Sequence, residues 1–155
     1  MDKLSRRDFL KTSALTGAGL VACVAVGSLP ALAADGLPLN ERPEAAASKF
    51  GAMSCAEALA ETYADLVGLS ADQGRKVAAG FGLGMGRKQT CGAVTVMLMI
   101  AGLAGQKKSC PSLMEAFEKE SGSLQCAYFV DSHGYSRCRD LLRTASGLLN
   151  AQIFV

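Results

Sequence analysis

The sequence predicts a small all-α bundle of about five helices. Apolar residues recur at steps of three and four in several segments, which is the spacing that places them on one face of a helix. No segment alternates apolar and polar residues with the period of two that a half-buried strand requires. Ser70 and Ser112 each precede Gln or Glu by three residues, a capping-box pattern that is typical of helix N-termini.

The first expected helix covers residues 44–67, a segment without proline that is rich in Ala, Glu and Leu. Its apolar residues keep helical spacing, and Gly68 follows as a stop signal. A short second helix begins after Ser70 and ends near Ala79. This assignment places Cys55 in the middle of the first helix.

Three further helices are expected after the glycine-rich segment 80–86. Each is marked by its apolar residues and by a terminal signal. They cover residues 91 to about 104, with Thr90 as the expected N-cap, 112 to about 121, and 137 to 150. The helix from residue 91 is apolar almost all round, so we expect it at the centre of the bundle. A polar turn at 131–134 precedes the last helix.

Two adjacent arginines, Arg6 and Arg7, precede an uncharged apolar run at residues 14–33. This order predicts a twin-arginine export signal over residues 1–33, with cleavage after Ala33 in the sequence Ala-Leu-Ala. The twin-arginine translocase is then a partner during export, and the mature protein is periplasmic or otherwise extracytoplasmic. Two alternatives stay open: an uncleaved membrane anchor, and a lipoprotein whose lipid-bearing N-terminus is Cys23.

The 122 residues that follow the signal suffice for one domain with one core. Residues 34–49 are assigned to an N-terminal segment with the start of the first helix, and residues 50–155 to the domain that carries the cysteines. The mature chain has twelve basic and twelve acidic residues, and this balance argues against a nucleic-acid partner. Its high apolar fraction is compatible with a homodimer.

Glycines alternate along the segment GFGLGMG at residues 80–86. Neither nucleotide-binding pattern fits, because no Lys-Ser/Thr pair follows and the segment comes after a helix instead of a strand. The simple interpretation is a close approach of two helices, which glycine permits. The sharper interpretation is that the loop points backbone amides at a bound anionic group, by means of Gly82, Gly84 and Gly86. We expect the start of the following helix to lower the pKa of Cys91.

Five cysteines follow the signal: Cys55, Cys91, Cys110, Cys126 and Cys138. No two of them have C-x-x-C spacing, which excludes the thioredoxin-type, c-type haem and zinc-knuckle patterns. Spacing alone leaves three interpretations open: a metal site shared by four helical elements, two disulfides with one thiol left over, and buried thiols without chemistry. The twin-arginine route weakens the disulfide interpretation, because it carries proteins that fold, and often receive a cofactor, before export.

The order of the cysteine motifs resembles a known family. Cys55 lies in MSCAEAL, Cys91 in VAAGFGLGMGRKQTCGAVTVMLMIAGL, Cys126 ends SGSLQC, and Cys138 opens CRDLLRTASGLL. Over about residues 50–150 these motifs resemble the C_GCAxxG_C_C family, which is named for its cysteines and associated with redox activity. Cys110 is outside the pattern, and Thr90-Cys91-Gly92-Ala93 replaces Gly-Cys-Ala at its centre.

The resemblance implies an exported electron-transfer protein with an iron–sulfur cluster on Cys55, Cys91, Cys126 and Cys138, since such domains are similar to the cluster-holding part of split-Soret cytochromes. A [2Fe–2S] cluster is favoured over a [4Fe–4S] cluster, and a redox partner protein is implied. The side chains expected to keep water from the cluster are Phe81, Met85 and Val94.

Two alternatives stay open beside the cluster. In a thiol–disulfide redox protein the same cysteines cycle in pairs, with Cys91 as the attacking thiolate because Arg87 and Lys88 lie near it. In a structural domain they form inert disulfides. The sequence identifies no catalytic site, because the single histidine, His133, has no paired nucleophile and is expected in solvent rather than among the cluster ligands.

Overall fold

The computed structural model describes residues 36–155, so the export signal, its expected cleavage site and Cys23 lie outside the described part. The described residues form seven α-helices: α2 (Arg42–Lys49), α3 (Cys55–Tyr63), α4 (Ala71–Ala78), α5 (Gly92–Leu103), α6 (Cys110–Ser121), α7 (Cys126–His133) and α8 (Cys138–Gln152). The all-α prediction is confirmed, with seven helices where about five were expected, and no strand occurs in this part of the chain. None of these helices has the length and apolarity that a membrane crossing requires.

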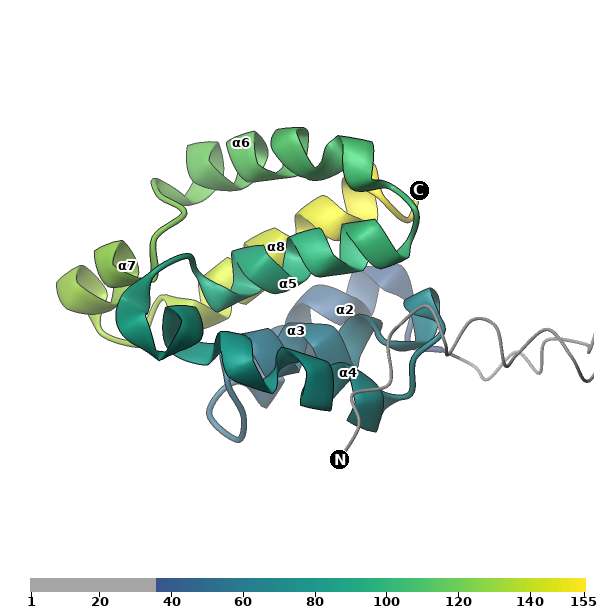
Figure 1. Ribbon diagram of the computed structural model, residues 1–155, viewed down its shortest axis with the longest axis horizontal. Coiled ribbons are helices and arrows are strands. Elements are labelled where there is room, and N and C mark those ends of the chain that lie inside the picture. The colour runs from purple at the N-terminus through teal and green to yellow at the C-terminus, as the bar shows by residue number, and fades with distance from the viewer. Residues whose placement is uncertain (1–35) are drawn as a thin grey trace, which may run out of the picture. The chain divides into compact units, whose positions relative to one another are not determined.

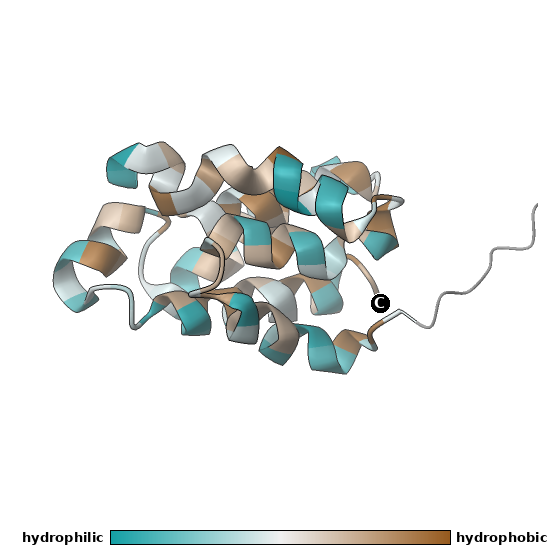
Figure 2. Cartoon of the chain, turned by 90° about the horizontal axis from the view of Figure 1, so that it is seen from below, coloured by the Kyte–Doolittle hydropathy of each residue, from teal (hydrophilic) through white to brown (hydrophobic). Residues whose placement is uncertain are grey.

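The apolar helix α5 lies at the centre of the bundle, as its composition predicts. It packs against α3, α6 and α8, while α2 packs on α8 and α4 packs on α3 (Figure 1). The other helices expose polar residues along one side and apolar residues along another (Figure 2), so the apolar sides meet around α5. Helix α7 lies at one end of the bundle, beside the loop Gly84–Lys88, and this end carries the candidate site (Figure 1).

The prediction of a single helix over residues 44–67 is wrong, because residues between α2 and α3 interrupt the helix. Gly51 adopts a φ of 112°, which glycine reaches without strain. Ser54 then starts α3 with a capping box: its hydroxyl accepts from the Glu57 N–H at 3.3 Å, and the Glu57 carboxylate accepts from the Ser54 N–H at 3.0 Å. Cys55 is therefore the first residue of a helix instead of a mid-helix residue.

The other expected helices occur at the predicted positions, but some of them begin or end at other residues than predicted. Ser70 caps α4 with the predicted capping box, and Gly122 ends α6 with a φ of 95°. Helix α6 begins at Cys110 instead of Ser112, and the cap of α5 is Cys91 instead of Thr90. Helix α7 was not predicted, and its last turn covers most of the expected polar turn at 131–134.

Arg42 is fully buried in the bundle although it is charged. Its guanidinium donates to both carboxylate oxygens of Asp65, at 2.7 and 2.6 Å, and to the carbonyl of Thr62. The same group lies over the Tyr63 ring, 5.3 Å from its centroid. Since Asp65 lies two residues after the last residue of α3, these contacts fix the start of α2 against the end of α3.

Replacing Arg42 by methionine is expected to lower the free energy of unfolding by about 2 kcal/mol. The Thr62 carbonyl loses its donor, whereas Asp65 is 45% exposed and regains water. Urea denaturation followed by circular dichroism measures the change. The control is Lys76→Met, which breaks only an exposed pair with Asp72 and should cost less than about 0.5 kcal/mol. Equal losses in the two variants would contradict the role assigned to Arg42.

Candidate functional site

All five cysteines of the described residues lie at helix starts, and four of them belong to the candidate site. Cys55, Cys126 and Cys138 are the first residues of α3, α7 and α8, and Cys91 is the N-terminal cap of α5. A helix N-terminus carries free N–H groups and a partial positive charge, so it favours sulfur in its anionic form. The bundle therefore directs four positive helix ends, each with a thiol, toward one region.

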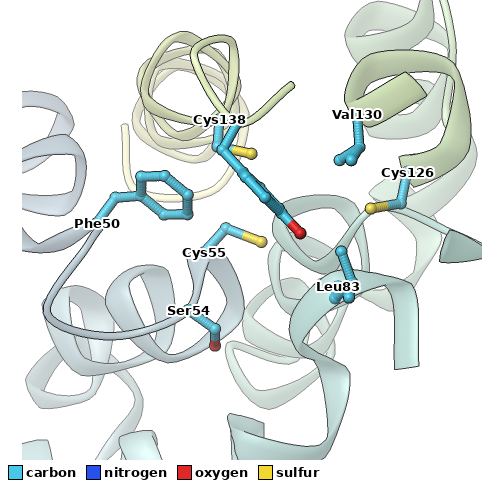
Figure 3. Close-up of a pocket in the computed structure, with 8 residues that line it drawn as sticks. Phe50, Ser54, Cys55, Leu83, Cys126, Val130 and Cys138 are labelled. Atoms are coloured by element: carbon cyan, nitrogen blue, oxygen red, sulfur yellow. The ribbon is translucent and has the colours of Figure 1, made fainter. Parts of the chain in front are cut away.

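Three of these thiols share a cavity of about 140 Å³. Its lining consists of Phe50, Ser54, Cys55, Leu83, Cys126, Val130, Tyr135 and Cys138. The sulfur atoms of Cys55, Cys126 and Cys138 face this space from three different helices (Figure 3). Cys91 is buried beside Cys55 and does not line the cavity. Apart from the sulfurs the walls are mainly apolar, so the cavity offers soft ligands in dry surroundings.

The residues that enclose the cavity differ from those expected. Met85 is 42% exposed, Val94 is fully buried in the core, and Phe81 packs against that core, so none of the three lines the cavity. The apolar and aromatic lining comes from Phe50, Leu83, Val130 and Tyr135. Leu83 lies between two of the glycines that the sequence singles out. Its position in this loop was the one sequence feature that could have identified it as a residue of the cavity wall. Val130 belongs to the helix that sequence analysis missed.

Cys55 and Cys91 are direct neighbours. The Cys91 thiol donates a hydrogen bond to the Cys55 sulfur, and the pKa of Cys55 falls to about 7 as a result. Backbone N–H groups of Ala56, Ala93 and Leu83 add to this lowering against the opposing effect of burial. The donor role and burial raise the pKa of Cys91. The prediction of a lowered pKa at Cys91 is therefore wrong, because the stabilised thiolate is that of Cys55.

Alkylation of Cys55 by iodoacetamide in the metal-free protein is expected to follow a titration with its midpoint at about pH 7. The thiolate is the nucleophile, so the rate rises as pH increases through this pKa and falls below it. Cys138 should react slowly up to about pH 9, because burial raises its pKa to about 12. Peptide mass spectrometry after timed quenching measures both rates in one sample. Equal rates for the two thiols at neutral pH would contradict this assignment.

The glycine loop has an unusual backbone beside these thiols. Three non-glycine residues in this loop and the turn after it have positive φ angles: Leu83 at 51°, Met85 at 58° and Lys88 at 55°. Residues other than glycine enter this region at a cost of about 1 to 2 kcal/mol each, which the surrounding contacts must offset. Such strain is typical of functional sites, and here it brings the Leu83 N–H to the Cys55 sulfur.

The three glycines of the loop differ in their surroundings. A Cβ at Gly82 would lie 2.8 Å from the Ser54 Cβ, and one at Gly84 would lie 2.9 Å from the Cys126 Cβ. Gly86 has open space around it. Gly82 and Gly84 thus permit close approach to the site, which is the simple interpretation of the glycines. Amide donation by Gly82, Gly84 and Gly86 to a bound group stays a prediction.

Hydrogen bonds hold Cys126 to the end of this loop. Its backbone N–H donates to the carbonyl of Gln89 at 2.6 Å. Lys88 forms an exposed ion pair with Asp131 of α7 at 2.5 Å. Burial raises the pKa of Cys126, so this thiol carries its proton at neutral pH. The loop therefore connects the start of α7 to the sulfur pair at Cys55.

The four thiols surround one region but are not gathered as a finished metal site. Within residues 36–155 no three His, Cys, Asp or Glu side chains lie close enough to hold one metal ion as they stand. All five cysteines described are free thiols. Cys110 lies apart from the cavity, with its thiol 4.0 Å from the Leu98 carbonyl, and His133 is exposed at the end of α7.

Two family models match the chain. The model of C_GCAxxG_C_C, whose description is "Putative redox-active protein", matches residues 53–152. A model of the twin-arginine translocation signal sequence matches residues 3–22. Comparison with curated proteins and with solved structures gives no significant match. The longer match covers about two thirds of the chain and includes all four cysteines at the cavity.

Proposed function

The chain belongs to the C_GCAxxG_C_C family and carries a twin-arginine export signal, and from this premise we propose an exported electron-transfer protein with an iron–sulfur cluster. The ligands in this proposal are Cys55, Cys91, Cys126 and Cys138. One observation supports it most strongly: three of these thiols line one apolar cavity and the fourth adjoins it. The translocase acts during export, and delivery of a folded protein by this route suits a cofactor inserted beforehand.

The chemistry of the donor set fits an iron–sulfur cluster. Such clusters take four thiolates, and their potentials depend on hydrogen bonds to sulfur and on exclusion of water. Four helix starts and three backbone N–H groups at Cys55 supply positive charge and donors. Phe50, Leu83 and Val130 supply apolar walls. A bound cluster would exchange single electrons, while these residues hold it and keep water away.

Binding also requires a modest closure of the site. Cys126 and Cys138 feel the charge of Cys55 across the cavity, but neither hydrogen-bonds to it as Cys91 does. We infer that these two thiols move inward when the cluster is inserted. The [2Fe–2S] form remains the favoured one, because the smaller cluster is the easier to enclose in a cavity of about 140 Å³ that closes around it.

We also propose a location, a redox partner and a homodimer for this protein. A protein released after export would act in the periplasm or another extracytoplasmic space, with a redox protein as its electron donor or acceptor. A homodimer belongs to the proposal as well. Size-exclusion chromatography with light scattering on the exported protein distinguishes one copy from two.

Anaerobic purification of the exported protein tests the cluster directly. The expected result is a coloured protein with visible charge-transfer absorbance, about two irons and about two acid-labile sulfides per chain. About four irons and four sulfides would indicate a [4Fe–4S] cluster instead. A colourless, iron-free protein whose thiols oxidise reversibly in pairs would refute the cluster and favour the thiol–disulfide alternative.

A further inference from the structure

We propose that in the metal-free protein Cys55 and Cys91 form a dithiol–disulfide pair, and that the Leu83–Gly84 turn excludes Cys126 from it. This inference concerns the protein before or without a cluster, so it does not rest on the proposed iron–sulfur function. It assigns unequal roles to four cysteines that the family pattern treats alike.

The contact between Cys55 and Cys91 supports the pairing. A hydrogen bond joins the two sulfurs, and both residues are buried, with exposures of 7% and 3%. The neighbouring Gly92 has no side chain, and a Cβ there would lie 3.0 Å from the Cys55 sulfur. The start of α5 therefore lies directly against the Cys55 side chain. Disulfide formation requires such proximity, because the bond spans only about 2 Å between sulfurs.

The Leu83–Gly84 turn lies between Cys55 and Cys126. The Leu83 N–H reaches the Cys55 sulfur on one side. The next residue, Gly84, is so close to Cys126 on the other side that a Cβ would lie 2.9 Å from the Cys126 Cβ. The Leu83 side chain lines the cavity that both cysteines face (Figure 3). Two consecutive residues thus contact the two cysteines and keep them apart.

A spacer role for the Leu83 side chain explains why a leucine occupies a position with left-handed backbone. Leucine enters that region at a cost, whereas glycine would enter it freely, as it does at Gly84 and Gly86. Glycine at this position would leave the gap between the two cysteines unfilled. A leucine side chain in the gap is therefore a positioning element, since it touches the cavity without carrying out chemistry itself.

The pair can exchange with a small disulfide such as oxidised glutathione. Cys55 lines the cavity and Cys91 lies behind it, so Cys55 is the sulfur that the reagent reaches first. Its thiolate attacks one glutathione sulfur and expels the other glutathione as a thiolate. Cys91 then loses its proton, attacks the Cys55 sulfur and releases the second glutathione. Two protein thiols are oxidised, one disulfide reagent is reduced, and the two protons leave on two glutathione thiols.

Peptide mapping of the full chain, prepared metal-free with a chelator and oxidised with glutathione disulfide, tests the pairing. The expected product is one intramolecular disulfide, Cys55–Cys91, with a loss of two hydrogens and with Cys126 and Cys138 still alkylatable. Cys91→Ser should abolish the disulfide, and the double variant Cys126→Ser/Cys138→Ser should retain it. A Cys126–Cys138 or Cys55–Cys126 bond as the main product would overturn the proposal, and iron analysis of the anaerobic protein would be unaffected.

A matched pair of variants tests the role of Leu83. Leu83→Gly should raise the yield of the Cys55–Cys126 disulfide at least tenfold over the parent protein. Met85→Gly is the control, since Met85 has a similar φ in the same loop but does not line the cavity. It should leave the pairing unchanged. If Leu83→Gly does not fold, Leu83→Ala removes most of the same side chain, and unchanged pairing in a folded Leu83 variant would refute the spacer role.

Discussion

Serine in place of Cys55, Cys91, Cys126 or Cys138 is expected to abolish iron binding, whereas Cys110→Ser should bind iron as the parent protein does. Each of the four thiols lines the cavity or contacts one that does. A hydroxyl keeps its proton at neutral pH and is a poor ligand for the iron of a sulfur cluster. Cys110 lies at the start of a helix too, but α6 does not border the cavity, so a helix start alone does not make a ligand.

Iron content and visible absorbance of proteins purified without oxygen provide the measurement. Circular dichroism is the companion readout, because a variant that lacks iron and keeps its helical signal has lost a ligand and not its fold. Loss of iron in Cys110→Ser together with full loading in Cys138→Ser would exchange the roles assigned to the two residues. Full loading of all five single variants would refute the four-ligand site.

The sequence predicts the fold class well because it is decided by hydrophobic periodicity, but periodicity hid the break at residues 50–54. Phe50 and Met53 continue the helical spacing of apolar residues through this break, and Gly51 is the residue that lets the chain turn. The signal for the new start was available, since Ser54 and Glu57 form the same kind of capping box that predicts α4 correctly at Ser70. Because the sequence prediction overlooks this signal, it places Cys55 in the middle of a helix instead of at a helix start, where its thiolate is stabilised.

The candidate site was predictable in its cysteines but not in its internal order. Cysteine spacing and family resemblance single out four thiols, and neither says which two are in contact. The Cys55–Cys91 contact arises from the packing of α3 on α5, a tertiary relation across 36 residues of chain. The left-handed turn at Leu83 was equally hidden, because leucine gives no local reason to expect a positive φ.

Gly84→Ala is expected to lower the free energy of unfolding by about 3 to 4 kcal/mol, because it combines backbone strain with overpacking. The backbone φ of 54° already disfavours a side chain. The added Cβ would also lie 2.6 Å from the Gln89 nitrogen and 2.9 Å from both the Gln89 carbonyl oxygen and the Cys126 Cβ. Backbone atoms cannot rotate away as a flexible side chain does, so the loop and the start of α7 must shift together.

Gly86→Ala separates the two causes of this loss. Gly86 has a φ of 71° in the same loop, but a Cβ added there would meet no atom within 4 Å, so only backbone strain of about 1 kcal/mol is expected. The difference of about 2 to 3 kcal/mol between the variants then measures the close approach of the loop to Cys126. Urea denaturation gives both values, and iron loading should fall in Gly84→Ala alone, because only that change displaces a proposed ligand. Equal stability losses in the two variants would mean that the loop yields freely at Cys126, and the contact would then have no role in positioning that thiol.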